Sequence, residues 1–330
     1  MKTRILSRHC IARLSLILFF GSLTQFCNVS YGQAFPSRPV KIIIPYPPGG
    51  SAEVQARIVG QKLSEIWGQP VIIDYKPGAG TTIGANYVAS AAPDGYTLYL
   101  AGTSHAVSGA LYKNLNYDVV KSFSPISLIA TSPFLVVTPI GKPFNSVKDL
   151  VDAAKANPGE ITYASSGSGT GPHLSGELFR SQAGINVIHI PYKGTSPALT
   201  ALVGGQVDFM IADIAASSLI KGGKLKVLAL TTGKRSPQFE GVPTLAESGY
   251  PNLSITNWSG ILAPANTPTA IINKINADIV SALSDPDIRN RYRNQDLESV
   301  SSSPKYFSDF IASESQKYSK AIKDAGIIVD

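Results

Sequence analysis

The chain has 330 residues, of which 44% are hydrophobic and 15% are charged, and its formal net charge is +7. This length suits two domains of ordinary size better than one small core. The hydrophobic content excludes a disordered chain, and the spread of the 29 glycines and 23 prolines along the sequence excludes collagen-like and low-complexity proteins.

The first 34 residues have the layout of a secretory signal peptide. They contain no acid and open with four basic residues, which are Lys2, Arg4, Arg8 and Arg13. A largely apolar run follows at 14–26, and Gly32-Gln33-Ala34 or Ser30-Tyr31-Gly32 supplies a cleavage pattern of small residues. The run is shorter than the about 20 residues that a membrane-spanning helix needs. We therefore expect residues 1–34 to be a signal peptide that is removed during secretion.

Removal of this leader changes the net charge and the cysteine content of the chain. Four basic residues leave without an acid, so the net charge falls from +7 to +3, and both cysteines, Cys10 and Cys27, leave with them. The secreted chain then has no thiol or disulfide chemistry. The arginines at 289–293 are flanked by acidic residues, which is typical of a solvated helix face. We therefore expect no binding of nucleic acid.

Short apolar runs rich in β-branched residues alternate with helical patterns after the leader. We expect strands at 40–44, 71–75 and 97–101, and helices at about 51–67 and 83–91. Proline and glycine mark the turns between them. This order predicts a doubly wound α/β sheet.

A second unit of the same kind follows, and the chain then ends in helical patterns. We expect helices at 146–156, from the turn at 165–171 to about 183, and at 197–203 and 215–220. The expected strands lie at 161–164, 187–190, 207–211 and 225–230. After an extended piece near 253–262, only helical patterns remain, at 268–284, 286–294 and 303–323.

Two α/β units followed by helices without strands predict a chain that returns to its first lobe. We expect one lobe to comprise 35–134 and 259–330, and the other to comprise 135–258. The extended segments at 134–137 and 255–258 are the expected crossings. A ligand would then lie between the lobes, at the carboxyl ends of the strands.

Two glycine-rich turns, at 46–51 and 165–170, each join the end of a strand to the start of a helix. Free backbone N–H groups and the positive end of the helix dipole point out of such turns, which favours a carboxylate or a phosphate. Hydroxyl donors would come from Ser51, Ser166, Ser168 and Thr170. The alternative is that the glycines only permit tight turns. Glu53 would repel an anion, so we expect its side chain to point aside.

Other chemistries have less support. No G-x-G-x-x-G or phosphate-loop motif is complete, and the histidines show no metal-ligand spacing. His189 alternates within an apolar strand and is interpreted as structural, whereas His173 either reaches a bound anion or is structural. A hydrolase using Ser168 with His173 and Asp213 lacks the glycine that G-x-S-x-G requires at position 166.

An ordered set of short motifs runs through the chain. They are Phe35-Pro36-Ser37-Arg38-Pro39-Val40, Pro45-Tyr46-Pro47-Pro48-Gly49-Gly50, Pro77-Gly78-Ala79-Gly80 with Ile83-Gly84, Pro93-Asp94-Gly95-Tyr96-Thr97-Leu98, Tyr192-Lys193-Gly194, Gly204-Gly205-Gln206-Val207-Asp208, Val242-Pro243-Thr244-Leu245-Ala246-Glu247 and Leu262-Ala263-Pro264. Together they resemble the Bug family, the extracytoplasmic solute receptors of tripartite tricarboxylate transporters. The resemblance covers essentially the whole chain after the leader.

The resemblance implies a two-lobed periplasmic binding protein fold of type II, without enzymatic activity, metal or cofactor. It implies a periplasmic receptor, expected to be a monomer, that closes on a small organic anion and delivers it to membrane permease subunits. The expected ligand-binding residues are Tyr46, Gly49, Gly50, Ser51, Ala52, Thr103, Ser104, Ser166, Ser168, Gly169, Thr170, His173, Tyr192 and Asp213.

The turns also constrain the ligand. No arginine lies in either turn, so neutral donors would hold the anion, which suits a mono- or dicarboxylate better than a phosphate. Tyr46 and Tyr192 would flank either an aliphatic or an aromatic acid. Two alternatives stay open at this point: a secreted hydrolase using Ser168, and a sensor that passes its ligand to a signalling partner.

Overall fold

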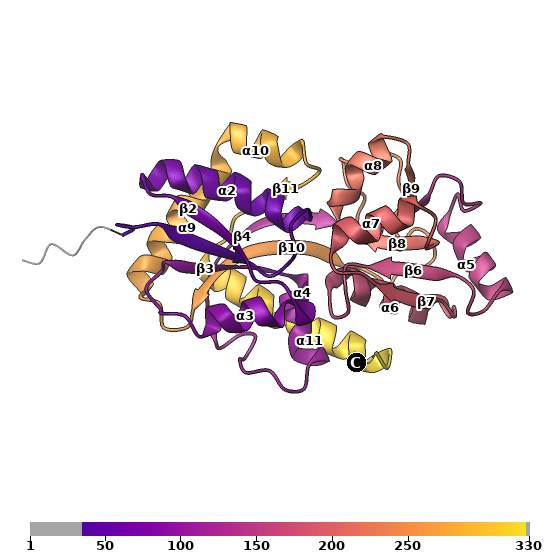
Figure 1. The fold of residues 1–330 in the computed structure, drawn as a ribbon, viewed down its shortest axis with the longest axis horizontal. Helices are drawn as coiled ribbons and strands as arrows, with labels where there is room; N and C mark the ends of the chain where they lie inside the picture. The colour runs from indigo at the N-terminus through magenta and orange to yellow at the C-terminus, as the bar shows by residue number, and fades with distance from the viewer. Residues whose placement is uncertain (1–34, 328–330) are drawn as a thin grey trace, which may run out of the picture. The chain divides into compact units, whose positions relative to one another are not determined.

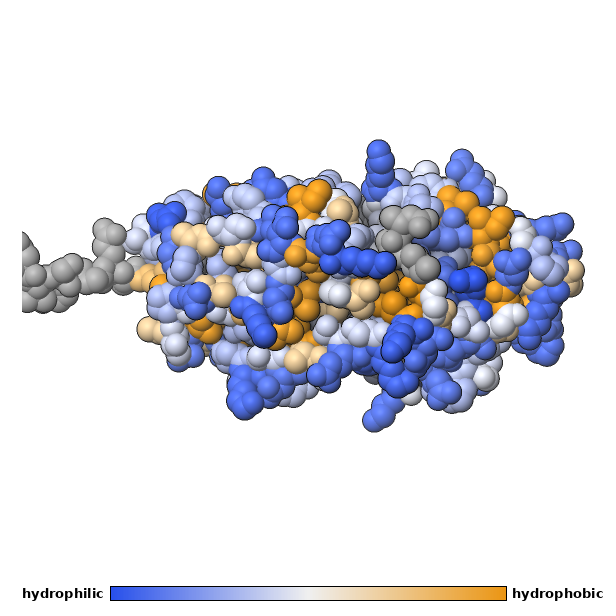
Figure 2. All heavy atoms as spheres, turned by 90° about the horizontal axis from the view of Figure 1, so that it is seen from below, coloured by the Kyte–Doolittle hydropathy of each residue, from blue (hydrophilic) through white to orange (hydrophobic). Residues whose placement is uncertain are grey.

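A computed structural model describes residues 35–327, so the predicted signal peptide and both cysteines lie outside the described residues. Within the described part, no helix has the length and hydropathy needed to cross a membrane. The described residues form two β-sheets covered by helices (Figure 1). Figure 2 shows one face, on which hydrophobic residues form separate patches among hydrophilic ones.

The first sheet has six strands in the order β11-β4-β10-β3-β1-β2. Its strands are β1 (Val40–Ile44), β2 (Val71–Tyr75), β3 (Thr97–Gly102), β4 (Phe123–Pro133), β10 (Thr256–Pro264) and β11 (Glu298–Ser299). The three strands β1, β2 and β3 are parallel, with Ile42 beside both Ile73 and Leu98. Strand β10 lies antiparallel between β3 and β4. The parallel part is the doubly wound unit that the sequence predicts.

Helices cover both faces of this sheet. On one face, α2 (Ser51–Trp67), α9 (Thr269–Ser284) and α10 (Pro286–Arg293) pack together. Figure 1 shows α3 (Thr82–Ala89), α4 (Thr103–Leu111) and α11 (Pro304–Asp324) on the other face, with the 3₁₀ turn η1 (Ala79–Thr81) leading into α3. The apolar side chains of β1 are therefore enclosed, and Ile42, Ile43 and Ile44 are fully buried.

The second sheet has five strands in the order β7-β6-β8-β5-β9. Its strands are β5 (Leu135–Pro139), β6 (Thr162–Ser165), β7 (Ile188–Pro191), β8 (Phe209–Ala212) and β9 (Leu225–Leu230). Strands β6, β7 and β8 are parallel, whereas β5 is antiparallel to both β8 and β9. The accompanying helices are α5 (Val147–Ala156), α6 (Gly171–Ala183), α7 (Thr195–Val203), η2 (Ile214–Ala216) and α8 (Ser217–Lys221).

Two extended segments join the sheets, and Thr231 links them to each other. Phe134 alone separates β4 from β5, and Ile255 directly precedes β10. The backbone N–H of Phe134 donates to Thr231 Oγ1 at 3.1 Å, and Thr231 Oγ1 donates to the Ile255 carbonyl at 2.6 Å. Backbone bonds reinforce both contacts. Strands of the first sheet therefore come from both ends of the described chain, and those of the second from its middle.

Four elements depart from the sequence-based expectations. Helix α4 and strand β4 were not expected, and β5 is a strand of the second sheet where only an extended crossing was expected at 134–137. Strand β11 shows that the expectation of helical patterns alone after the extended piece near 253–262 was wrong. Helix α4 lacks an amphipathic pattern because its polar residues Thr103, Ser104, His105 and Ser108 are all buried. Strand β4 contains prolines at both ends, Pro125 and Pro133, which weaken a strand signal.

Candidate ligand-binding site

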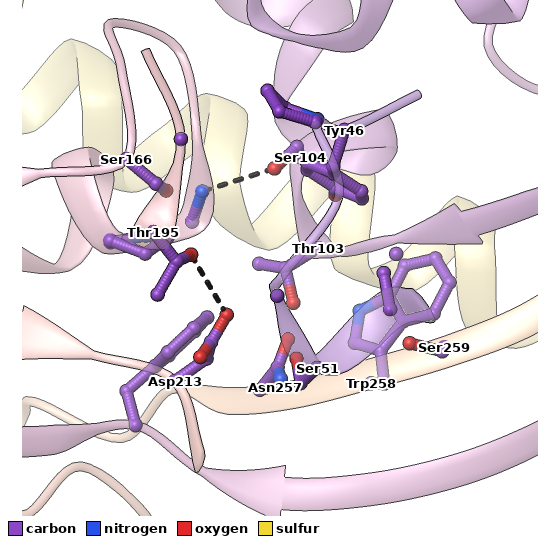
Figure 3. A pocket seen from close by; sticks show the side chains of 18 residues that line it. Tyr46, Ser51, Thr103, Ser104, Ser166, Thr195, Asp213, Asn257, Trp258 and Ser259 are labelled. Carbon is purple, nitrogen blue, oxygen red and sulfur yellow. Dashed lines mark hydrogen bonds between the residues drawn. The ribbon is translucent and has the colours of Figure 1, made fainter. Parts of the chain in front are cut away.

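Segments attached to both sheets enclose a cavity of about 50 Å³. From the first sheet, the lining comes from the turn after β1 with the start of α2, the junction of β3 and α4, and the start of β10 (Figure 3). From the second sheet, it comes from Ser166, Gly171 with Pro172, Gly194 with Thr195, and Asp213. These segments follow the carboxyl ends of β1, β3, β6, β7 and β8, where a ligand is expected in an α/β fold.

Four helices, α2, α4, α6 and α7, begin at this cavity, and in none of them does the side chain of the N-cap residue accept a hydrogen bond. Side chains from other elements reach two of these helix starts: Ser104 accepts from the Gly171 N–H of α6, and Asp213 accepts from Ser51 of α2. Elsewhere in the described chain, Ser146, Asp285 and Ser303 cap α5, α10 and α11, whereas α3, α8 and α9 also lack a capping side chain. The first N–H groups of an uncapped helix keep free hydrogen-bonding capacity and carry the positive end of the helix dipole. The cavity is therefore suited to a negatively charged group.

Glycines allow the backbone at the starts of α6 and α7 to approach neighbouring elements closely. At Gly194, which precedes α7, φ is +111°, a conformation that side chains with a Cβ rarely adopt. At Gly171, the first residue of α6, an added Cβ would lie 2.7 Å from Phe134 Cζ. The Gly171 N–H donates to Ser104 Oγ at 3.1 Å, so this close approach joins an element of the second sheet to one of the first.

Trp258 contributes an unused donor. This residue of β10 is 1% exposed and lines the cavity, and its indole nitrogen has no hydrogen-bond partner. Figure 3 shows that nitrogen on the side of the ring facing Thr103. A buried N–H without a partner costs free energy, so a ligand oxygen that accepted this bond would recover it.

Uncharged groups dominate the remaining lining. Among the described residues, no Lys, Arg or His lines the cavity. Burial raises the pKa of the Tyr46 hydroxyl to about 12, so this side chain stays protonated and acts as a neutral hydrogen-bonding group. The sequence has no arginine in the two glycine-rich turns, and the rest of the described lining has none either.

Asp213 is the acidic residue of the lining. It follows β8, and its Oδ1 accepts from the Ala215 N–H at 2.9 Å while its Oδ2 accepts from Thr195 Oγ1 at 3.2 Å (Figure 3). Burial of the carboxyl raises its pKa, and hydrogen bonds from Ala215, Thr195 and Ser51 act in the opposite direction. Asp213 thus places an acid within a cavity suited to an anion.

Eight of the predicted ligand-binding residues line the cavity, and six do not. The eight are Tyr46, Gly50, Ser51, Ala52, Thr103, Ser104, Ser166 and Asp213. The six outside the lining are Gly49, Ser168, Gly169, Thr170, His173 and Tyr192. The role of all fourteen in binding stays a prediction.

The six residues outside the lining take part in contacts within their own turns and with the other lobe. The carbonyl of Gly49 accepts from Ser196 Oγ at 3.2 Å, and that of Ser168 accepts from the Tyr112 hydroxyl at 3.4 Å. Thr170 Oγ1 donates to the Gly167 carbonyl, and the Tyr192 N–H to the Ser165 carbonyl. These contacts shape the turns that carry the lining residues.

The two histidines of the second sheet support its serine-rich turn. Nδ1 of His173 accepts from the Gly169 N–H at 3.2 Å, and Nε2 of His189 lies 2.7 Å from Ser165 Oγ. Their rings stack with centroids 4.3 Å apart. Burial lowers the pKa of both rings, that of His189 to about 4, so both are neutral near pH 7. His173 thus fits the structural alternative left open by the sequence.

Glu53 points away from the cavity, as expected. Its Oε2 accepts from the Gly49 N–H at 2.8 Å, and its Oε1 accepts from Arg57 Nε at 2.7 Å. The bond from Gly49, with further help from Arg57, lowers the pKa of this carboxyl. The acid at the start of α2 therefore fixes the turn after β1.

Sequence reasoning missed several lining residues, among them Phe134, Thr195, Asn257 and Trp258. Thr195 carried a usable signal, since Gly194 joins a strand end to a helix start as the other glycine-rich turns do. Phe134, Asn257 and Trp258 lie at the crossings, where an apolar extended pattern gives no sign of facing a ligand.

Two α/β sheets joined by two crossings, with a cavity at their strand ends, define a periplasmic binding protein fold. The family described as tripartite tricarboxylate transporter family receptor matches residues 55–327. Among curated relatives, BugT of Bordetella pertussis is 36% identical, covering 95% of this chain and 97% of that protein. The chain belongs to the tripartite tricarboxylate transporter receptor family, which includes the Bug proteins.

Solved structures agree with this assignment. The periplasmic binding protein BugD is 33% identical, with a TM-score of 0.85 over 89% of this chain and 99% of that one. Rpa4515 of R. palustris, solved with adipate, is 33% identical, with a TM-score of 0.86 over 89% and 99%. MatC of Rhodopseudomonas palustris, solved with malate, is 30% identical, with a TM-score of 0.82 over 87% and 100%.

Proposed function

We propose that this receptor captures a small organic carboxylate in the cavity between its two sheets and delivers it to the permease of a tripartite tricarboxylate transporter. The observation that carries the proposal is the convergence of four uncapped helix N-termini on a cavity whose described lining has no cationic side chain. Backbone N–H groups and the free Trp258 indole would hold the carboxylate.

Adipate and malate, the acids bound by the related Rpa4515 and MatC, indicate the ligand class. The mechanism we infer is closure: residues 35–134 with 256–330 form one lobe, 135–255 form the other, and they move about the crossings beside Thr231. The expected lobe boundary at 258 moves to 255 because Thr256–Trp258 pair with β4. We further propose that the protein acts as a periplasmic monomer without a cofactor or catalytic activity, after removal of residues 1–34.

A thermal-shift screen of residues 35–330 tests the binding. Adipate, malate, other aliphatic acids and aromatic carboxylates are added in turn. A ligand at 100 times its dissociation constant stabilises the native state by about 2.7 kcal/mol, which raises the melting temperature measurably. We expect at least one of these acids to do so, and to be recovered chemically unchanged. Conversion of the acid by the wild type, lost in Ser168→Ala, would instead establish a hydrolase.

Thr195→Val and Thr200→Val form a matched pair on α7. Thr195 lines the cavity, whereas the exposed Thr200 bonds only to the Ser196 carbonyl of its own helix. We expect Thr195→Val to weaken the binding of adipate or malate about tenfold, measured by calorimetry, because a hydrogen bond in a dehydrated site is lost. Thr200→Val should bind as the wild type does. Equal affinities in the two variants would place the site elsewhere.

A further inference from the structure

Asp213 presents a charge problem for the proposed ligand, and this inference rests on the proposed function. Its carboxylate lines a cavity that, among the described residues, has no Lys, Arg or His. Its Oδ2 lies 3.9 Å from the position that a Cβ on Gly50 would take, so it reaches the N-terminus of α2. Asp213 follows a strand of the second sheet, whereas α2 packs on the first. The acid therefore occupies the place where a ligand anion would bind.

No neighbouring charge compensates Asp213. The turn after β1 presents the protonated Tyr46 hydroxyl, α7 presents Thr195, and β10 presents Asn257. On α2, Ser51 faces Asp213, while the carboxylate of Glu53 is held by Gly49 and Arg57. The donors to Asp213 are thus the neutral groups of Ala215, Thr195 and Ser51.

A second carboxylate cannot enter such a cavity with its charge unchanged. Two like charges in contact repel more strongly in a buried site than in water, because the effective dielectric constant there is lower. Two carboxylates sharing a site therefore hold one proton between them, because one pKa rises strongly. The neutral donors around Asp213 can then donate to both carboxyl groups, and the shared proton forms a hydrogen bond between the two.

We propose that Asp213 makes carboxylate binding proton-coupled, so that each ligand molecule whose carboxylate meets Asp213 takes up one proton from solvent. The charge balances: an ionised Asp213 and a ligand carboxylate enter with one proton, and a pair with a single negative charge results. Asp213 becomes the O–H donor to the ligand carboxylate. The residue is thereby a specificity determinant, since it favours ligands that accept this hydrogen bond.

The Asp213 carboxyl is poised for this role. Its burial already disfavours the ionised form before a ligand arrives, which raises its pKa. A ligand carboxylate adds repulsion of the same sign, so the pKa rises further on binding. The uptake reaches one whole proton per ligand when Asp213 is ionised in the free receptor and protonated in the complex.

Calorimetry with adipate and with malate, in buffers of different ionisation enthalpy, measures the proton exchanged. We expect the uptake of about one proton per ligand near pH 7. The dissociation constant should then rise about tenfold for each unit of pH. Asp213→Asn keeps Oδ1 to accept from the Ala215 N–H and places its NH2 group as a donor towards Thr195 Oγ1. In this variant uptake should vanish and affinity should become independent of pH.

Two further variants separate the proposal from a structural effect. Thr195→Val should weaken binding but retain the uptake of a proton, because Asp213 is still present. Asp152→Asn, at an exposed acid of α5, should keep both the affinity and the uptake. Binding by the wild type without proton uptake, or undiminished uptake in Asp213→Asn, would overturn the proposal while leaving carboxylate capture intact.

Discussion

At the scale of single residues, Gly171 shows how closely the two sheets approach at the cavity. A Cβ at this position would lie 2.7 Å from Phe134 Cζ and 3.4 Å from Thr103 Cβ. Both neighbours lie outside the second α/β unit that contains Gly171, one at a crossing and one on α4. The substitution Gly171→Ala therefore acts on the contact between the lobes rather than on the core of either.

We expect Gly171→Ala to weaken adipate or malate binding at least about fivefold, because overpacking of this kind costs about 1–3 kcal/mol. Thermal stability without ligand should change little, since alanine favours helix α6. Titration calorimetry and thermal unfolding measure the two effects. Gly141→Ala is the matched control, as its added Cβ meets nothing within 4 Å. Unchanged affinity in Gly171→Ala would contradict a closed binding form with this geometry.

At the scale of elements, the sequence predicted the strands and helices that have a regular apolar pattern. Strands β1 and β3 are apolar runs buried on both sides, and helix α5 has an amphipathic pattern with a serine cap. Helix α4 escaped prediction because its buried face is polar and finds partners only in the fold: Ser108 bonds to the His105 carbonyl, and His105 to the Val119 carbonyl. The two glycine-rich turns predicted the starts of α2 and α6 at the cavity, whereas the starts of α4 and α7 were missed. The Trp258 donor required the arrangement of β10 beside β3.

His105 of α4 predicts how stability depends on pH. The ring is fully buried, Nε2 lies 2.8 Å from the Val119 carbonyl, and Nδ1 has no partner. Burial lowers the pKa of His105 from 6.5 to about 4. Between these two pH values only the unfolded state binds the proton. The stability that neutral His105 provides is therefore complete above pH 6.5 and is lost as pH falls towards 4.

We expect this group to reduce the free energy of unfolding by about 1.4 kcal/mol per pH unit within that window. Urea unfolding at pH 7, 6 and 5 measures the slope for the wild type and for His105→Gln, whose side-chain amide can still donate to Val119. The difference between the two slopes isolates His105, because His173 and His189 are present in both proteins. Identical slopes would show that the ring is already protonated in the native state.

At the scale of the whole described chain, few hydrogen bonds join the two lobes beside the cavity. One ion pair, from Lys221 Nζ to Asp296 Oδ2 at 2.7 Å, also joins the lobes outside the cavity lining. Ser104 Oγ accepts from the Gly171 N–H, Ser196 Oγ donates to the Gly49 carbonyl, and the Tyr112 hydroxyl donates to the Ser168 carbonyl. Each such bond contributes about 0.5–1.5 kcal/mol net, so together they favour the closed form only modestly. Movement about the Thr231 crossings can therefore open the cavity at a small cost.

A carboxylate that contacts both lobes binds the closed form with higher affinity and shifts the population towards it. We expect small-angle scattering to show a decrease in the radius of gyration when adipate or malate saturates the protein. Sodium chloride at equal ionic strength is the control, and it should leave the radius unchanged. Ser104→Ala removes one contact between the lobes, so it should not decrease the radius of gyration of the free protein. It should raise the ligand concentration at which the radius of gyration decreases. An unchanged radius at saturation, with binding verified by calorimetry, would mean that the ligand enters without closure.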